Sequence, residues 1–507
     1  MINFASVVDR NADRFPDAVA VSETDREVTH AELRTRVDAL SVALLELGIQ
    51  RGDILGVLLY NHIEFIETMF AANRIGAAVV PLNYRLSDAE WSFILDHANA
   101  VAIVTEAEFA DKIDAIAPGL PLLKHKLTLS DTQDDSWTKY SHLVDRHLGA
   151  RTELVDVEPS DLQRLMYTSG TTARPKGVMI SHENLIYKNL AHILEFSLTS
   201  ADTTLVCGPL YHVGGMDLPG LATLHVGGRL RLLRKFDPVL VIDAIENLKP
   251  TNIWLAPSMM NAILQLPDIA DRDTSSIRFI TGGGEKMPVP LLDRIARTFP
   301  ESWFADAYGL TETVSGDTIN DAAHMRSKVG SVGRPVAHTQ IAILDDSGNS
   351  VSADTLGEIA VRGPKVMSGY WRDPEATATA LRGGWFHTGD IGRLDSDGFL
   401  YIEDRKKDMI VSGGENIASP EVERVLYENP DVIEAAVIGV PDARWGEVPK
   451  AFVVLRPGST IDVEDLKEFC RARLAKYKVP SSIVYIGSLP RTPSGKVLKR
   501  SLREVTP

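Results

Sequence analysis

The chain has 507 residues, of which 44% are hydrophobic and 24% are charged, and its formal net charge is −16. This length and composition predict a globular protein of more than one domain, and the negative charge argues against general nucleic-acid binding, which needs a basic surface. Cys207 and Cys470 fit no metal-ligand spacing, and no apolar run approaches the ~20 residues of a transmembrane helix. Since the first residues show no secretory pattern, we expect a cytoplasmic protein with reduced thiols.

Strands and helices are expected to alternate along the first part of the chain, after a stretch over residues 1–50 that looks helical at both ends and has a turn at 23–26. Residues 117–160 are more polar, and we expect an irregular connection there. The predicted elements are strands at 54–59, 77–81 and 100–105 and helices at 64–74 and 89–97. This alternation is typical of βαβ units around a parallel sheet.

A similar alternation returns in the middle of the chain. The predicted elements there are helices at 239–247, 258–266 and 290–299 and strands at 252–256, 277–281 and 303–305. Two halves of this kind predict an α/β fold of two related βα-layered subdomains with a ligand cleft between them.

From about residue 325 the pattern changes to short strands separated by Gly- and Asp-rich turns, which predicts a small β subdomain. Its expected strands are 340–344, 358–361 and 399–402. The last hundred residues predict a separate α+β unit with helices at 420–427 and 463–475 and strands at 435–440, 451–455 and 483–486. We therefore expect an N-terminal domain over residues 1–402, a hinge at 403–407 and a C-terminal domain over 408–507.

Residues 167–178 read Y-T-S-G-T-T-A-R-P-K-G-V, which concentrates hydroxyl groups, glycine and one lysine. Such residues let backbone N–H groups and an ammonium face an anion, so the stretch predicts a polyphosphate-binding loop. It fails the pattern of P-loop NTPases because Pro175 replaces the second glycine and Gly177 stands at the Ser/Thr position. The alternative is a polar turn between a strand at 162–167 and a helix after Ser181. The candidate ligand contacts are Thr168, Ser169, Gly170, Thr171, Thr172 and Lys176.

The loop resembles the phosphate-binding signature of the adenylate-forming superfamily, which comprises acyl-CoA synthetases, aryl-CoA ligases, adenylation domains of peptide synthetases, and luciferases. That family usually shows T-S-G-T-T-G-x-P-K-G, and here Ala173 replaces the last glycine. The resemblance runs from about residue 10 to about residue 503, with at least six motifs in the family's order. It implies a large N-terminal domain, a small mobile C-terminal domain, and ATP as a substrate.

Two further stretches carry groups suited to a nucleotide. Residues 281–285 read T-G-G-G-E, whose glycines would let a flat ligand lie against bare backbone, although a plain turn is the alternative. Residues 306–313 read D-A-Y-G-L-T-E-T and offer an aromatic face, a hydroxyl and a carboxylate suited to Mg²⁺. The resemblance implies that Glu312 and Thr171 act in catalysis and hold Mg²⁺. It also implies nucleotide contacts from Gly283, Gly284, Glu285, Asp306, Ala307, Tyr308, Gly309 and Thr311.

The second half of the chain holds the remaining motifs. Asp390 lies in H-T-G-D-I-G, and the alternative to a functional role is an ordinary aspartate in a turn. Arg405 and Lys407 lie in D-R-K-K-D, and the alternative there is a solvated run of charges. The resemblance implies that Asp390 and Arg405 contact ribose and that Lys407 is the hinge residue. It also implies that Gly413 and Gly414 line a pantetheine channel.

Lys496 and His212 complete the candidate site. Lys496 follows P-S-G in a basic C-terminal stretch, and His212 follows an apolar run in P-L-Y-H-V-G-G. A basic tail and a packed histidine are the alternatives; the resemblance implies a catalytic lysine and a gate beside the acyl site.

Together these motifs predict an ATP-dependent acid–CoA ligase, an AMP-forming acyl-CoA synthetase that uses ATP, Mg²⁺ and CoA. The rival hypotheses are a ligase that loads a separate carrier protein, an adenylate-dependent oxygenase of luciferase type, and a catalytically silent nucleotide-binding regulator. Residues 212–217, 282–284 and 310–316 are expected to line the acid pocket together with Trp254. Gly214, Gly215 and Gly316 suggest room there for a medium or long acyl chain or for a ring system. An acyl chain of that length would imply a role in fatty acid metabolism. The oligomeric state stays open.

Overall fold

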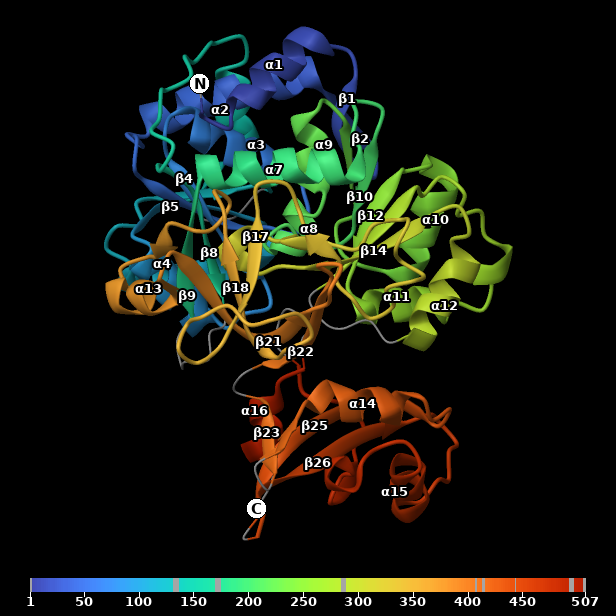
Figure 1. Cartoon of the computed structure of the whole chain (residues 1–507). Coiled ribbons are helices and arrows are strands. Elements are labelled where there is room, and N and C mark those ends of the chain that lie inside the picture. The colour runs from blue at the N-terminus through green and yellow to red at the C-terminus, as the bar shows by residue number, and fades with distance from the viewer. Residues whose placement is uncertain are drawn as a thin grey trace.

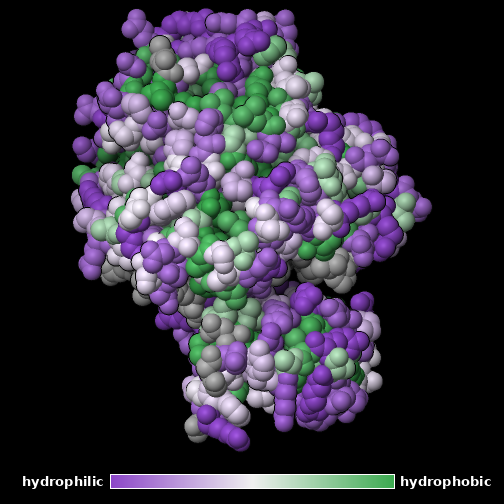
Figure 2. Space-filling view, viewed as in Figure 1, coloured by the Kyte–Doolittle hydropathy of each residue, from purple (hydrophilic) through white to green (hydrophobic). Residues whose placement is uncertain are grey.

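The computed structural model describes residues 2–130, 136–168, 175–283, 289–405, 408–412, 415–442, 444–491 and 497–504. They form a large N-terminal domain and a small C-terminal domain, which is drawn in orange and red in Figure 1. Figure 2 shows a waist between the two domains, with hydrophilic and apolar side chains mixed on both sides of it. Within the described ranges, no helix is both long and apolar enough to cross a membrane.

The first sheet of the N-terminal domain is built around β3, which is parallel to β4 and β5 and is buried along its whole length. Such burial is expected for a strand that is covered on both faces of a sheet. In spatial order its strands are β19 (Gly369–Tyr370), β9 (Lys176–Ser181), β8 (Leu162–Thr168), β4 (Ala78–Pro81), β3 (Ile54–Leu58), β5 (Ala100–Thr105), β6 (His125–Thr128) and β7 (Thr138–Lys139). Its connecting helices include α3 (Ile63–Arg74), α4 (Asp88–His97) and α5 (Ala107–Ile116). The predicted alternation over residues 54–105 is confirmed.

Two expectations about this sheet are wrong. Residues 117–160 are not an irregular connection throughout, since they contain β6, β7 and α6 (Tyr140–Arg146). β6 reads H-K-L-T next to the edge strand, and only its last two residues are buried, so its sequence lacks an apolar run. Residues 176–181, before the helix that follows Ser181, are also not a loop, because they form β9 antiparallel to β8, with Thr168 opposite Lys176. Residues 169–174 therefore connect two antiparallel strands.

The second sheet combines strands from the middle of the chain with an N-terminal hairpin. β1 pairs in parallel with β11, with Val21 opposite Leu230, and the predicted turn at 23–26 joins β1 to β2. In spatial order the strands are β16 (Arg334–Pro335), β15 (Thr318–Ile319), β14 (Trp303–Tyr308), β13 (Phe279–Gly282), β12 (Asn252–Leu255), β10 (Thr203–Val206), β11 (Arg229–Leu232), β1 (Val19–Glu23) and β2 (Arg26–Thr29). The N-terminus thus completes the second half of the domain.

Helices cover these sheets, as Figure 1 shows for α1, α2, α7 and α10. The start of α2 is fixed by a capping box, in which Thr29 accepts from the Glu32 backbone and the Glu32 carboxylate accepts from the Thr29 backbone. The helices not yet given are α1 (Ser6–Arg14), α2 (His30–Glu46), α7 (His182–Phe196), α8 (Val213–Asp217), α9 (Gly220–His225), α10 (Pro238–Leu248), α11 (Pro257–Leu264) and α12 (Val289–Thr298). The helices and strands predicted for residues 239–305 are confirmed.

The predicted β subdomain is confirmed as an antiparallel sheet of β17 (Gln340–Leu344), β18 (Gly357–Arg362), β21 (Trp385–Leu394), β20 (Leu381–Arg382) and β22 (Leu400–Arg405), with α13 (Pro374–Ala380) beside it. The T-G-D stretch lies within β21 and not in a turn between strands. Gly389 there has a φ of 72°, and the pairing of β21 shifts register on both sides. The glycine lets the strand bulge, which a sequence pattern shows as a turn.

The C-terminal domain packs its own core around β25 and β26. Its elements are β23 (Ile410–Ser412), β24 (Glu415–Ile417), α14 (Ser419–Tyr427), β25 (Val432–Asp442), β26 (Gly446–Leu455), α15 (Val463–Arg471), β27 (Ser482–Tyr485) and α16 (Lys499–Glu504). At the waist, the backbone N–H and hydroxyl of Ser419 donate to the Asp404 carboxylate, at 2.8 and 2.7 Å.

Candidate functional site

The predicted phosphate loop is anchored at both ends by the β8–β9 ladder. Thr168 and Lys176 are opposite each other where the ladder ends, and the Lys176 ammonium lies 5.0 Å from the centre of the Tyr370 ring. Ser169, Gly170, Thr171 and Thr172 lie outside the described residues. The arrangement brings a cation and an aromatic ring to the base of the loop.

Glu312 lies next to the same tyrosine. It sits in a single 3₁₀ turn, Thr311–Thr313, and its carboxylate accepts a 3.0 Å hydrogen bond from the Tyr370 hydroxyl. Burial, reinforced by the negative charge of Glu312, raises the pKa of Tyr370 well above its usual range. Tyr370 lies in the two-residue strand β19 and belongs to none of the sequence motifs.

A second cluster joins Tyr308, Asp390 and Arg405. The Tyr308 hydroxyl donates to the Asp390 carboxylate at 2.7 Å, and the Arg405 guanidinium lies 3.4 Å from the other oxygen of that carboxylate. Asp390 is opposite Arg405 in the β21–β22 ladder. Tyr308 is 7% exposed within an apolar cluster, and burial, with the charge of Asp390, raises its pKa well above the usual range. The three predicted residues are therefore brought together, and most of the Tyr308 ring is packed in protein.

The glycines after β13 are explained in part by close packing against β14. A Cβ built at Gly282 would lie 2.2 Å from the Phe304 ring, and one built at Gly283 would lie 2.8 Å from the Ala307 carbonyl oxygen. In the direction of the missing Cβ, these glycines pack against the neighbouring strand and do not expose bare backbone. A Cβ at Gly309 would likewise lie 2.3 Å from the Gly316 nitrogen. Gly284 and Glu285 lie outside the described residues.

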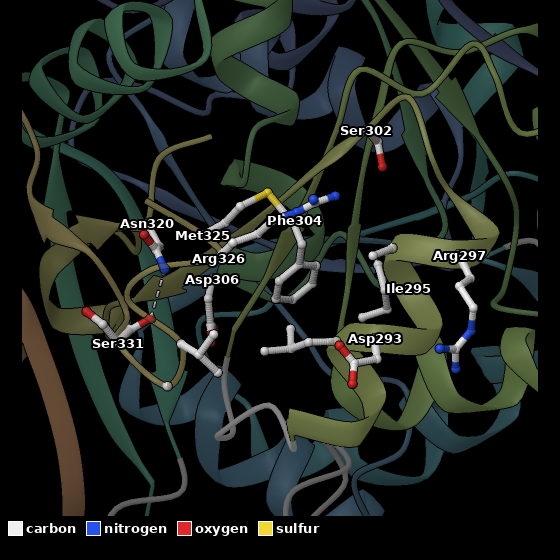
Figure 3. Close-up of a pocket in the computed structure, with 14 residues that line it drawn as sticks. Asp293, Ile295, Arg297, Ser302, Phe304, Asp306, Asn320, Met325, Arg326 and Ser331 are labelled. Atoms are coloured by element: carbon white, nitrogen blue, oxygen red, sulfur yellow. Dashed lines mark hydrogen bonds between the residues drawn. The ribbon is translucent and has the colours of Figure 1, made fainter. Parts of the chain in front are cut away.

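Asp306 lies on the wall of a cavity of about 540 Å³ between α12, β14 and the segment 320–331. Figure 3 shows Asp306 and Phe304 on one wall, Asp293, Ile295 and Arg297 on the α12 side, and Met325 and Arg326 above. Asn320 donates weakly to the Ser331 carbonyl at the edge, at 3.4 Å. The lining of the cavity combines apolar side chains with charged ones.

The segment expected to border the acid is tightly packed. The His212 ring accepts a hydrogen bond from the Gly214 N–H at 3.0 Å, which caps α8, and its centre is 5.9 Å from that of the Trp254 ring. A Cβ at Gly214 would lie 2.4 Å from Trp254, and one at Gly316 would lie 2.3 Å from His192. A Cβ at Gly215 would meet the Pro209 carbonyl oxygen at 2.4 Å. These glycines accommodate neighbouring groups, so they give no support to an open space for a long chain.

Asp217 does not face an acid pocket. It is fully buried, its carboxylate lies 2.5 Å from Arg164, and the Lys188 ammonium donates to its carbonyl oxygen at 2.7 Å. Burial, opposed by the charge of Asp217, lowers the pKa of Lys188 to about 7. This cluster ties β8 and α7 to α8.

The predicted hinge lysine and the predicted site residues of the C-terminal domain are not described. Lys407, Gly413, Gly414 and Lys496 all lie outside the described ranges. Their surroundings are a hairpin of β23 and β24 on either side of 413–414 and an antiparallel bridge between Arg491 and Val497 on either side of 492–496.

Comparison with known proteins gives the family. The model of the family described as "AMP-binding enzyme" matches residues 8–371, and that of "AMP-binding enzyme C-terminal domain" matches residues 421–496. The chain is 41% identical to feruloyl-CoA synthase of Amycolatopsis sp over 97% of both chains. It is 36% identical to indoleacetate–CoA ligase of Aromatoleum aromaticum over 98% of this chain and 97% of the relative.

Among solved structures, an anthranilate CoA ligase in complex with anthranoyl-AMP superposes with a TM-score of 0.92 at 27% identity, and the match covers 99% of this chain and 96% of the other. The sequence comparisons and the structure comparison each extend over at least 97% of this chain. The chain therefore belongs to the AMP-binding enzyme family, whose two models match its large and small domains.

Proposed function

We propose that the protein is an ATP-dependent acid–CoA ligase that activates a carboxylic acid as an acyl adenylate and then transfers the acyl group to CoA. A carboxylate is a poor electrophile; when one of its oxygens attacks the α-phosphorus of ATP, pyrophosphate leaves and AMP becomes the leaving group of the acyl carbon. The CoA thiolate then attacks that carbon and releases AMP. The supporting observation is that Tyr308, Asp390 and Glu312 gather around the end of β14 in a chain that is similar to CoA ligases over 97% of its length.

Each residue has a proposed task. Asp390 and Arg405 would bind the ribose hydroxyls, because a buried carboxylate held by Tyr308 is oriented to accept two hydrogen bonds. Lys176 and Thr168, with the undescribed loop residues, would bind phosphates. Gly283, Asp306, Ala307, Gly309 and Thr311 would border the nucleotide.

The residues present fit a magnesium ion. Hard cations prefer carboxylate oxygens, and one oxygen of Glu312 is fixed by the Tyr370 hydroxyl. Glu312 would hold the ion with Thr171, and bound Mg²⁺ would neutralise charge on the phosphate oxygens.

We propose an aromatic acid as the substrate class. Ferulate, indoleacetate and anthranilate are the acids in the names of the relatives above, and none of these is a fatty acid. The indole of Trp254 lies against Gly214 and near His212, which would provide a flat wall beside a ring. His212 would stand between the acid and the incoming thiol.

The domain division is part of the proposal. We propose an N-terminal domain of residues 1–402, a hinge at 403–407 and a C-terminal domain of 408–507 that presents Lys496 for adenylation and Gly413–Gly414 for thiolation. β22 continues to Arg405, so the proposed hinge begins within this strand.

The test is a panel of ferulate, indole-3-acetate, anthranilate, octanoate and palmitate, with ATP and with or without CoA, scored for AMP and acyl-CoA. We expect CoA-dependent AMP release to be greatest with an aromatic acid. Adenylate formation without CoA consumption would instead favour transfer to a carrier protein. Acylation of an added phosphopantetheinylated carrier protein would then identify that acceptor.

The Lys496→Ala variant tests the roles of the two domains. It should lose pyrophosphate exchange by orders of magnitude, because the ammonium would stabilise charge mainly in the adenylation transition state. It should still convert supplied acyl adenylate to acyl-CoA near the wild-type rate. Equal loss of both half-reactions would contradict the alternating-domain proposal.

A further inference from the structure

The backbone that begins two residues after Glu312 is strained. Val314, Ser315 and Gly316 have φ values of 55°, 66° and 61°, so three consecutive residues lie in the left-handed region. Residues with a Cβ avoid this region, and a β-branched residue such as valine does so most strongly. Backbone of this kind persists only where the surrounding structure holds it, and it gathers at functional sites.

Lys365 is placed to hold this turn. Its side chain is 1% exposed, and its ammonium donates to the Ser315 carbonyl at 2.8 Å and to the Asp317 carboxylate at 2.6 Å. The other oxygen of Asp317 accepts a 2.5 Å hydrogen bond from the Thr313 hydroxyl. A buried ammonium is costly unless it is paired and hydrogen-bonded. Lys365 thus holds one residue within the turn and the residue after it, and Asp317 in turn holds Thr313 before the turn.

The segment that carries Lys365 also contacts Glu312 at two points. The Met367 N–H donates to the Glu312 carbonyl oxygen at 2.7 Å, and the Tyr370 hydroxyl donates to the Glu312 carboxylate at 3.0 Å. Tyr370 is in turn opposite Val178 in the ladder between β19 and β9. The segment 365–370 therefore links the phosphate-loop strand to the Glu312 turn.

We propose that Lys365 is a positioning residue, whose buried ammonium keeps residues 314–316 left-handed and thereby fixes Glu312 where the nucleotide reacts. Since Glu312 precedes the turn by two residues, release of the Ser315 carbonyl lets the turn relax toward negative φ and moves the Glu312 carboxylate away from Tyr370. Lys365 does not itself contact substrate. This inference rests on the proposed role of Glu312.

Hydrogen–deuterium exchange measured by mass spectrometry tests the structural part without any substrate. In Lys365→Met, peptides covering 313–317 should exchange at least about tenfold faster than in the wild type, because backbone bonds across the turn open more often. The matched control is Lys188→Met, which removes an equally buried ammonium that donates to the Asp217 carbonyl. It should lower thermal stability without selectively opening 313–317.

Ser315→Gly tests the mechanism by rescue. Glycine adopts φ near +60° without a Cβ clash, so the turn in Lys365→Met/Ser315→Gly needs less support. We expect the double variant to regain most of the exchange protection and most of the pyrophosphate-exchange kcat/KM lost in Lys365→Met, a loss of about tenfold or more. A general packing role for Lys365 would not be rescued by a glycine at position 315.

One further variant guards against misfolding. Lys365→Met/Asp317→Asn leaves no unpaired buried charge and is expected to fold. Normal protection at 313–317 in this variant, or in Lys365→Met, would overturn the proposal, as would failure of the glycine rescue. If no acid supports AMP release in the wild type, the proposed function fails, and the exchange experiment still decides whether Lys365 holds the turn.

Discussion

Gly214→Ala is the most direct test of how Trp254 is placed. A Cβ at position 214 would lie 2.4 Å from Cζ2 of the indole, and the next two atoms of the same ring would lie at 2.6 and 2.9 Å. Ordinary contact begins at 3.4 Å, so the indole has to move away from α8 by about 1 Å. Overpacking of this kind costs about 1–3 kcal/mol of stability. The Gly208 backbone lies close to the opposite edge of the same ring, since a Cβ built there would be 2.6 Å from it. The indole therefore has little room to move in that direction.

The displaced indole should lower activity as well as stability. A displacement of about 1 Å beside a reacting group lowers kcat/KM by up to about 100-fold. We therefore expect Gly214→Ala to unfold at a lower temperature in scanning fluorimetry and to lose about 10- to 100-fold in kcat/KM for its best aromatic acid, with little change in the KM for ATP. The ATP measurement separates a local effect on the acid site from a general loss of fold.

Two variants make this prediction refutable. Gly119→Ala is the matched control, since a Cβ there meets nothing within 4 Å, and it should leave both quantities unchanged. Trp254→Phe introduces a smaller ring, so the double variant Gly214→Ala/Trp254→Phe should be more stable than the sum of the two single effects. Wild-type stability and acid kinetics in Gly214→Ala would refute the reasoning, as would strictly additive effects in the double variant.

Three shorter predictions concern other groups. Tyr308→Phe removes the donor to Asp390, which should cost about 1–3 kcal/mol of stability and raise the KM for ATP, as measured by thermal melts and pyrophosphate exchange; an unchanged KM would argue against the ribose assignment. Tyr370→Phe removes the hydroxyl that donates to the Glu312 carboxylate, so half-maximal pyrophosphate exchange should need more Mg²⁺, whereas an unaltered Mg²⁺ titration would contradict that role. For His62, burial alone would lower the pKa, but hydrogen bonds to Glu106 and Glu23 raise it to about 9. Since an unfolded histidine titrates near ~6.5, this stabilisation is fully present below that pH and is lost as pH rises through 9, so His62→Gln should flatten the fall of melting temperature from pH 7 to 9.

The sequence by itself determined the elements whose signal is local. The apolar run at Ile54–Leu58 and the alternation that follows it predict βα units, because a strand buried on both faces needs apolar side chains throughout. The order of the nucleotide motifs determined the family in the same way, since each motif is a short stretch that can be read without its neighbours. The motifs predict that Asp390, Arg405 and Tyr308 contact one ligand, the nucleotide, and the structure brings these three residues together.

Only the tertiary structure decided which distant groups meet. Tyr370 contacts Glu312 because β19 adds to the edge of the first sheet beside β9, and nothing in a Gly-Tyr pair predicts that placement. The glycine at 214 in α8 suggests room for substrate, yet the indole of Trp254 from β12 packs against it. Asp217 was expected near a pocket and is instead buried against Arg164. In each case the partner lies on a different element, and which elements become neighbours depends on pairing and packing over the whole domain and not on local pattern.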